Sequence, residues 1–140
     1  MKVNHDIMRW VFALGVSLLV AFGAYEWITN SDRAFRRAIE EAVVLESRNI
    51  LLAYVGDAGD VRISDALDRV RAAGKVYIYP LPDGWELSGQ YKRANDAGWH
   101  AFLMRLDAQS ALVTLSVDDN DPDLVQKAAA DPRFKVGSGQ

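Results

Sequence analysis

An uncharged run near the N-terminus constrains this chain more than any other feature of its sequence. The run extends from Trp10 to Tyr25, and after Glu26 it continues through Trp27. A helix that spans a bilayer needs roughly 17–25 mostly apolar residues, and aromatic side chains are favoured at headgroup level. A carboxylate at that level costs far less than one at the bilayer centre. The run therefore predicts a single-pass transmembrane signal-anchor helix over residues 10–29.

Two other interpretations of the run remain open. In a cleaved signal peptide, Lys2 and Arg9 would form the charged start, residues 10–22 the apolar core, and residues 21–23 (Ala-Phe-Gly) the cleavage site. In a soluble protein the run would be a buried helix, but a 140-residue chain leaves little protein to surround it. We favour the anchor because the run is long and ends in aromatic residues.

The basic residues that flank the run bear on its orientation. Lys2 and Arg9 precede it, and Arg33, Arg36 and Arg37 follow it. The count slightly favours a cytoplasmic domain, whereas a short positive tail before an apolar core is how export signals begin. We expect a tail of residues 1–9 inside the cell. The protein would then lie in the inner (cytoplasmic) membrane, with its domain in the periplasm or outside the cell.

The remaining residues, 30–140, are enough for one soluble α+β domain with its own core. The formal net charge is −3 and the pI is about 5.3, so there is no basic surplus to bind nucleic acid. The sequence contains no cysteine, which excludes disulfides, thiolate metal sites and thiol catalysis.

A long amphipathic helix is predicted over residues 31–55, with Ser31 as its N-cap and its end near Gly56. Its apolar stripe consists of Phe35, Ile39, Ala42, Val43 and Ile50. The stripe either packs on a sheet or forms a contact with a partner helix or a second copy near the membrane.

Turn and β-propensity signals divide the rest of the domain. A short helix is expected from Ser64 to about Ala73, followed by Gly74 as its C′ residue. Strands are expected at residues 75–79, 85–93, 99–107 and 111–117, then a helix capped by Asp121 that ends near Ala130, and an edge strand at residues 133–136. The predicted fold class is α+β: a transmembrane helix, a long amphipathic helix, and a four- to five-stranded, mostly antiparallel sheet with two short helices.

Few residues offer catalytic or metal-binding chemistry. Of the two histidines, His5 lies in the tail and His100 lies in a predicted strand without a recognisable partner. The acidic run 118–123 resembles the start of a calcium loop, but Leu124 replaces the glycine and Ala130 the final glutamate. The simpler interpretation is a solvated turn before a capped helix. We therefore expect no enzyme activity, no metal and no cofactor.

Partner binding is the alternative role for the apolar side chains. Phe35, Ile39 and Val43 represent the helix stripe, and Tyr77, Tyr79 and Tyr91 would lie on an exposed sheet face. Aromatic residues on strands usually pack the sheet, but they also dominate interface hot spots. These six residues are the candidate interaction residues.

The order of a hydrophobic helix, an amphipathic helix and an antiparallel sheet resembles type IV pilins in layout and size. Pilins have a processing site before the apolar run, and here no Gly-Phe or Gly-Met pair precedes it. We assign no family on this likeness. The expected function is a non-enzymatic accessory of a bacterial envelope assembly (pilus, secretion or conjugation machinery). Its partners would be the bilayer and envelope proteins, self-association included. The alternatives are an extracytoplasmic sensor or small-ligand-binding module and, third, an envelope enzyme that uses the acidic residues.

Overall fold

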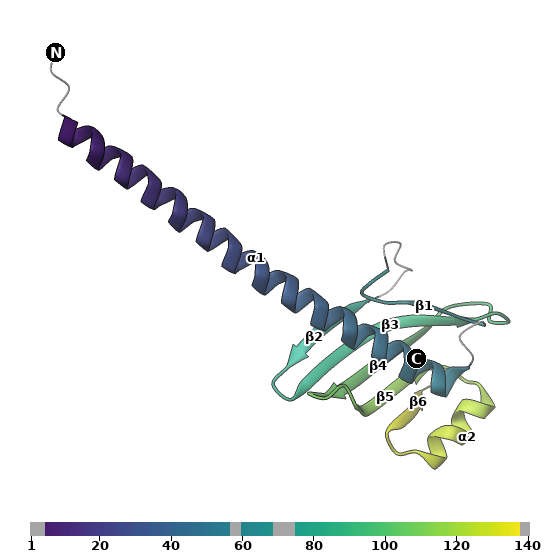
Figure 1. Ribbon diagram of the computed structural model, residues 1–140. Coiled ribbons are helices and arrows are strands. Elements are labelled where there is room, and N and C mark those ends of the chain that lie inside the picture. The colour runs from purple at the N-terminus through teal and green to yellow at the C-terminus, as the bar shows by residue number, and fades with distance from the viewer. Residues whose placement is uncertain (1–4, 57–59, 69–74, 138–140) are drawn as a thin grey trace. The chain divides into compact units, whose positions relative to one another are not determined.

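The computed structural model (Figure 1) describes the backbone of residues 5–56, 60–68 and 75–137, and the side chains of these ranges from Leu14 onward. The chain divides into two compact units, residues 1–39 and residues 40–140. Helix α1, His5–Val55, contributes to both units. The two units are described separately below.

The second unit is built around a mixed six-stranded sheet. Its elements are β1 (Val61–Ser64), β2 (Tyr77–Leu81), β3 (Gly84–Arg93), β4 (His100–Asp107), β5 (Leu112–Asp118), α2 (Pro122–Ala130) and β6 (Phe134–Gly137). The order is β1-β3-β4-β5-β6, and β2 pairs with the same strand, β3, as β1 does. All pairs are antiparallel except β5 with β6.

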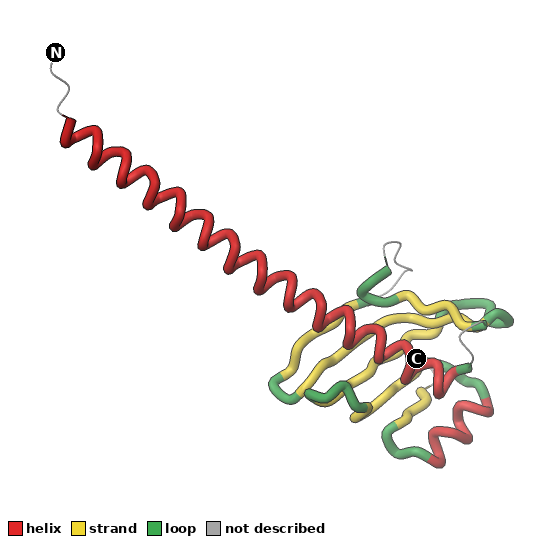
Figure 2. The backbone as a smooth tube through the Cα atoms, in the orientation of Figure 1, coloured by secondary structure: helices red, strands yellow, loops and turns green. Residues whose placement is uncertain are grey.

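Local signals explain the last helix and the strand that follows it. The Asp121 side chain accepts a hydrogen bond from the Asp123 N–H, and Pro122 occupies the first helical position. Helix α2 then carries the chain back along the edge of the sheet, beside β6 (Figure 2). A crossover of this kind is what a parallel strand pair requires, so β6 runs parallel to β5.

One face of the sheet, which we call the covered face, packs against residues 40–55 of α1 (Figure 1). Alternation along the strands supplies its apolar side chains. These are Leu87, Tyr91, Phe102, Met104, Leu106, Leu115, Val117 and Phe134, all buried. The helix contributes Val43, Val44, Ser47, Leu51 and Val55, also buried. Full burial of one such aliphatic side chain stabilises a fold by roughly 1.5–3 kcal/mol.

Polar contacts hold the same helical segment in place. Arg48 Nε lies 2.5 Å from Asp65 Oδ2, and Arg48 Nη2 donates to Oδ1 at 2.9 Å. This hydrogen bond to the nearly buried Asp65 carboxylate is the main cause that raises the pKa of Arg48. At the end of the helix, the Tyr54 hydroxyl donates to Asp131 Oδ2 at 2.6 Å, and Lys127 Nζ donates to the Tyr54 carbonyl at 2.7 Å.

The α+β class with a long N-terminal helix is confirmed, and several details are corrected. Ser31 is no N-cap, because α1 continues through it and its Oγ donates to the Ile28 carbonyl at 2.9 Å. The helix does end before Gly56, whose φ of 141° suits glycine. The sheet has six strands among the described residues rather than four or five. It is mostly antiparallel, as predicted, and only the β5–β6 pair is parallel.

The helix predicted from Ser64 is wrong at its start. Residues 61–64 form β1 and residues 65–68 form turns, because Val61, Arg62, Ile63 and Ser64 pair with the end of β3. The rest of that prediction, residues 69–73, lies outside the described residues. The predicted strand ended at residue 79, but β2 extends through Pro80 to Leu81. Its position away from the centre of the sheet makes the missing N–H of proline tolerable.

In the first unit, the large apolar side chains of α1 from Leu14 to Phe35 are exposed. Between Leu14 and Ile28 the exposed fractions of the large apolar residues range from 44% at Val16 to 76% at Trp27. Among the described residues, none of the helices has the apolar length that a bilayer crossing needs. The start of the predicted anchor, residues 10–13, lies outside the residues whose side chains the structure describes.

Candidate functional site

The sheet face opposite the covered face, which we call the open face, exposes aromatic and aliphatic side chains. Tyr77 and Tyr79 of β2 pair with Ser88 and Glu86 of β3, and Ser88 also pairs with Leu103 of β4. Residues that pair in this way point to the same side of the sheet. Tyr79 is 60% exposed and Leu103 is 42% exposed. The open face therefore offers apolar contact area without any rearrangement of the fold.

A shallow groove of about 400 Å³ runs along the open face. Its walls include Lys75, Tyr77, Ser88, Leu103 and Ser116. The Tyr77 hydroxyl donates to Glu86 Oε1 at 2.9 Å, and this hydrogen bond is the main cause that raises the pKa of the phenol. The Ser88 hydroxyl donates to the Lys75 carbonyl at 2.9 Å. These bonds orient the polar tips and leave the ring of Tyr77 free to contact a partner.

Tyr91 does not belong to this surface, so the prediction that it is exposed is wrong. It faces the covered side of the sheet and has no exposed area. Successive strand residues point to opposite faces, and an odd number of positions separates Tyr91 from Ser88. The sequence analysis could have assigned Tyr91 to the face opposite Ser88 from this alternation, but it did not use it.

The candidate residues on α1 fall into different environments. Phe35 is 69% exposed, Ile39 is half-buried, and Val43 is buried. Val43 belongs to the core of the second unit. An interaction role for Phe35 and Ile39 stays a prediction, as it does for Tyr77 and Tyr79.

A second polar cluster surrounds the guanidinium of Arg93 at the end of β3. Arg93 Nη2 donates to Asp119 Oδ2 at 2.8 Å, and Nη1 donates to Asp121 Oδ2 at 2.9 Å. Arg93 Nε donates to Asp96 Oδ2 at 3.1 Å. The buried Tyr91 hydroxyl donates to Asp119 Oδ2 at 2.5 Å. One arginine thus joins the β3–β4 turn to the β5–α2 turn.

The pKa values in this cluster show how completely its charges are paired. Burial alone would raise the pKa of Asp119, but the hydrogen bonds from Tyr91 and the Asp121 N–H and the charge of Arg93 outweigh it and lower the pKa. The pKa of Asp96 is also lowered, since hydrogen bonds from Arg93 outweigh the effect of its burial. Burial raises the pKa of Tyr91, and its bond to Asp119 raises it further. These carboxylates are ionised, and their oxygens already accept hydrogen bonds.

Carboxylates of the acidic run 118–123 therefore stabilise the turn between β5 and α2. Asp119 Oδ1 accepts from the N–H groups of Asn120 and Asp121, at 2.8 and 3.1 Å. Among the described residues, no cluster of three or more histidine or carboxylate side chains is arranged to hold a metal ion.

His100 has partners that the sequence did not reveal. Its Nε2 lies 3.3 Å from Asp96 Oδ2, and its Nδ1 lies 3.0 Å from the Asp118 carbonyl oxygen. Its ring centroid is 5.3 Å from that of Tyr91. His100 does lie in a strand, as predicted, at the start of β4, but it has the partners that the sequence analysis did not recognise.

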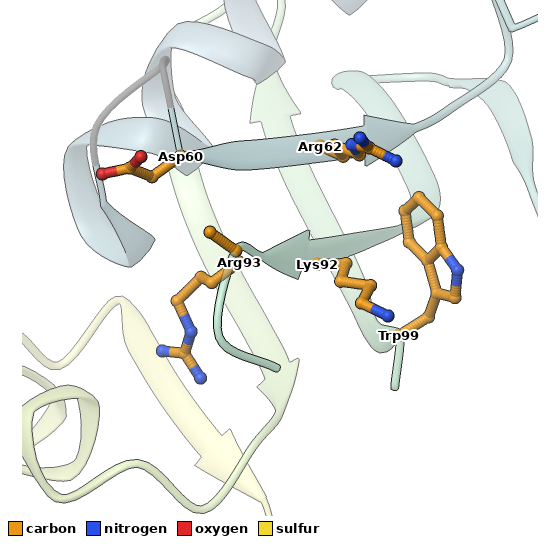
Figure 3. Close-up of a pocket in the computed structure, with 6 residues that line it drawn as sticks. Asp60, Arg62, Lys92, Arg93 and Trp99 are labelled. Atoms are coloured by element: carbon orange, nitrogen blue, oxygen red, sulfur yellow. The ribbon is translucent and has the colours of Figure 1, made fainter. Parts of the chain in front are cut away.

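A separate pocket of about 440 Å³ lies beside β1 and the end of β3. Its lining residues are Asp60, Arg62, Lys92, Arg93, Ala94 and Trp99. Figure 3 shows Arg62, Lys92 and Trp99 gathered at one end and Asp60 at the other, with the Arg93 side chain pointing away from them. The sequence analysis did not single out this group, because its members become neighbours only through pairing of β1 with β3.

Comparison with known proteins adds no relative to this description. No protein family, no curated protein and no solved structure matches the chain.

Proposed function

We propose that this chain is a membrane-tethered, non-enzymatic interaction protein of a bacterial envelope assembly, such as a pilus, secretion or conjugation machine. The observation that carries the proposal is the exposure of large apolar side chains over residues 14–28 of α1. Helices in water keep such residues on one stripe and cover it.

The apolar side chains of this segment surround the helix axis. Successive residues of an α-helix are about 100° apart, since one turn takes 3.6 residues. At that spacing Leu14, Leu18 and Tyr25 share one side, Val16, Val20 and Trp27 lie opposite, and Leu19 and Ile28 lie between them. A helix that is apolar all round needs an apolar environment on every side, which a lipid bilayer provides.

The open face of the sheet is the surface we assign to the protein partner. Tyr77, Tyr79 and Leu103 lie together there, on strands held rigid by their neighbours. Aromatic side chains on a rigid support lose little entropy on binding and are enriched at hot spots.

Extraction of membranes with alkaline carbonate tests the tether. We expect the full-length protein to stay in the pellet and the double variant Leu18→Arg/Leu19→Arg to move to the supernatant, because charges at the bilayer centre are costly. Leu45→Arg is the control, since Leu45 is also a leucine of α1 and is 52% exposed but lies in the second unit. Release of the unmodified protein by carbonate would refute the tether.

Orientation and partner contact need two further measurements. A C-terminal alkaline phosphatase fusion should be active and uncleaved if the domain lies outside the cytoplasm. A photo-crosslinking residue at position 79 should give adducts with an envelope protein or a second copy. The same residue at position 126, exposed on α2, serves as control. Equal labelling from both positions would remove the open face from the proposal.

A further inference from the structure

Two cations face each other across neighbouring strands of the sheet. Arg62 of β1 is the direct pairing partner of Lys92 of β3. Like charges in this position are destabilising. Lys92 Nζ makes one long hydrogen bond, to the Ala97 carbonyl at 3.4 Å. Among the described residues, no carboxylate forms an ion pair with Arg62 or Lys92. A pair of this kind is neutralised best by an anion from outside the chain.

The third cation of the pocket, Arg93, is not available to such an anion. Its guanidinium is bound by Asp96, Asp119 and Asp121 on the covered side of the sheet. The electrostatic attraction at this pocket therefore comes from Arg62 and Lys92.

An exposed indole stands beside these cations. Trp99 directly precedes β4, in which His100 pairs with Tyr91, so alternation places Trp99 on the same side as Lys92. Figure 3 shows its ring next to the Arg62 and Lys92 side chains. Trp99 is 41% exposed, although packing would normally bury so large a side chain. An indole in a pocket wall offers a flat surface on which another planar ring can stack.

The charge and size of the pocket narrow the class of ligand. A phosphate monoester carries about −1.5 to −2 charges at pH 7, which matches two cations better than the single charge of a carboxylate. The volume of about 440 Å³ lies within the roughly 300–1,000 Å³ typical of small-molecule sites. Asp60, at the far end, offers an acceptor for a hydroxyl or amino group (Figure 3).

From this juxtaposition we propose that Arg62, Lys92 and Trp99 form a binding site for a small organic phosphate monoester with a planar ring, of the mononucleotide type. Arg62 and Lys92 bind the phosphate, and the ring stacks on Trp99. The site lies within the second unit and is independent of the membrane tether and of the open-face partner, so each proposal can fail alone.

Calorimetric titration of the full-length protein in mild detergent tests the site with three probes. AMP has the phosphate and the ring, adenosine has only the ring, and glycerol 3-phosphate has only the phosphate, as a lipid headgroup does. We expect AMP to bind tightest, glycerol 3-phosphate more weakly, and adenosine weakest. AMP binding should weaken as salt rises, because the attraction is between exposed charges.

Single-residue variants measure how much each side chain of the site contributes to AMP binding. Arg62→Ala and Lys92→Ala should each weaken AMP binding about tenfold, as expected for loss of one charge-assisted bond. Trp99→Ala should weaken AMP binding several-fold and leave glycerol 3-phosphate unchanged. Arg105→Ala removes an exposed cation from β4, away from the pocket, and should leave AMP binding unchanged. Thermal unfolding of each variant checks that the fold is intact.

Several results would overturn the proposal. They are failure of the unmodified protein to bind AMP, equal binding of AMP and adenosine, and equal loss from Arg105→Ala and Arg62→Ala. Equal affinity for AMP and glycerol 3-phosphate would also overturn it, because the ring would then contribute nothing.

Discussion

Residues 14–39 and residues 40–55 belong to the same helix, α1, but their apolar side chains differ in exposure to solvent. From residue 14 to residue 28 the first stretch has apolar residues on every side, and the large ones are exposed. The second has a narrow apolar stripe and buries it against a sheet. Helical structure is therefore not what separates the two stretches. The distribution of apolar residues around the axis decides which of the two stretches one face of a sheet can cover.

The sheet repeats this contrast between its faces. The covered face holds Tyr91 and the carboxylates around Arg93, all fully partnered. The open face leaves Tyr79 and Leu103 in solvent, and nearby Arg62 and Lys92 lack acidic partners among the described residues. Stability should therefore depend on the covered regions, and binding on the exposed ones.

The largest expected difference in stability is between two single leucine variants of α1. Leu51→Ala should lower the free energy of unfolding by about 3–4 kcal/mol, because it opens a cavity in a buried site. Leu18→Ala, in the exposed stretch, should leave it within about 0.5 kcal/mol. Urea unfolding of the full chain in mild detergent, followed by near-UV circular dichroism, measures both. Similar losses from the two variants would break the comparison.

The next largest effect is expected for Arg93→Met. It should lower the free energy of unfolding by about 2–3 kcal/mol at pH 7, because it leaves the Asp119 carboxylate buried without its cation. Arg105→Met on the exposed side of β4 is the control and should be close to neutral.

The stability of the same variant should depend less on pH than that of the unmodified protein. In the unmodified protein the pKa values of Asp96 and Asp119 are lowered, so their stabilisation is complete above the ordinary carboxyl pKa and is lost as pH falls through the lowered values. Without Arg93, the pKa of Asp119 should be lowered less, because the arginine charge no longer helps the hydrogen bonds from Tyr91 and the Asp121 N–H to oppose the effect of burial. The variant therefore has less stability to lose on acidification. The stability difference between the two proteins should therefore shrink as pH falls from 7 to 3. A constant difference would mean that Arg93 acts through packing alone.

Arg48→Met should cost about 1–2 kcal/mol, since it removes two hydrogen bonds to the buried Asp65. The figure is modest because Arg48 is itself about one-third exposed and screened by water. Arg33→Met, in the exposed stretch of the same helix, should change stability by less than about 0.5 kcal/mol. Unfolding midpoints at low and high salt separate charge from packing.

The smallest stability effect is expected for Tyr79→Ala, within about 0.5 kcal/mol, because the side chain is exposed. The same change should reduce crosslinking to the partner from a neighbouring position such as Leu103. Marked destabilisation with unchanged crosslinking would mean that Tyr79 belongs to the fold rather than to an interface.

Local chemistry made several elements predictable. The Asp121-Pro122 pair marks the start of α2, Gly56 follows the end of α1, and alternation locates β3, β4 and β5 to within one or two residues. Each of these signals acts between residues that are close in sequence.

Other features could not be read locally. Residues near Ser64 look like a helix start, and only pairing with β3 makes them a strand. The face of Tyr91 was predicted wrongly, although strand alternation could have given it. The partners of His100 could not be read, because they come from the β3–β4 turn and from the end of β5.

The sequence by itself determined the ends of α1 and α2 nearest their local signals, the three central strands β3, β4 and β5, and the part of α1 that is apolar all round, because turns and periodicity depend on neighbours along the chain. Tertiary structure decided the rest. It brought Arg93 to Asp119, 26 residues away, and Arg62 to Lys92. Such contacts depend on strand order and register, which bring together residues that no local pattern relates.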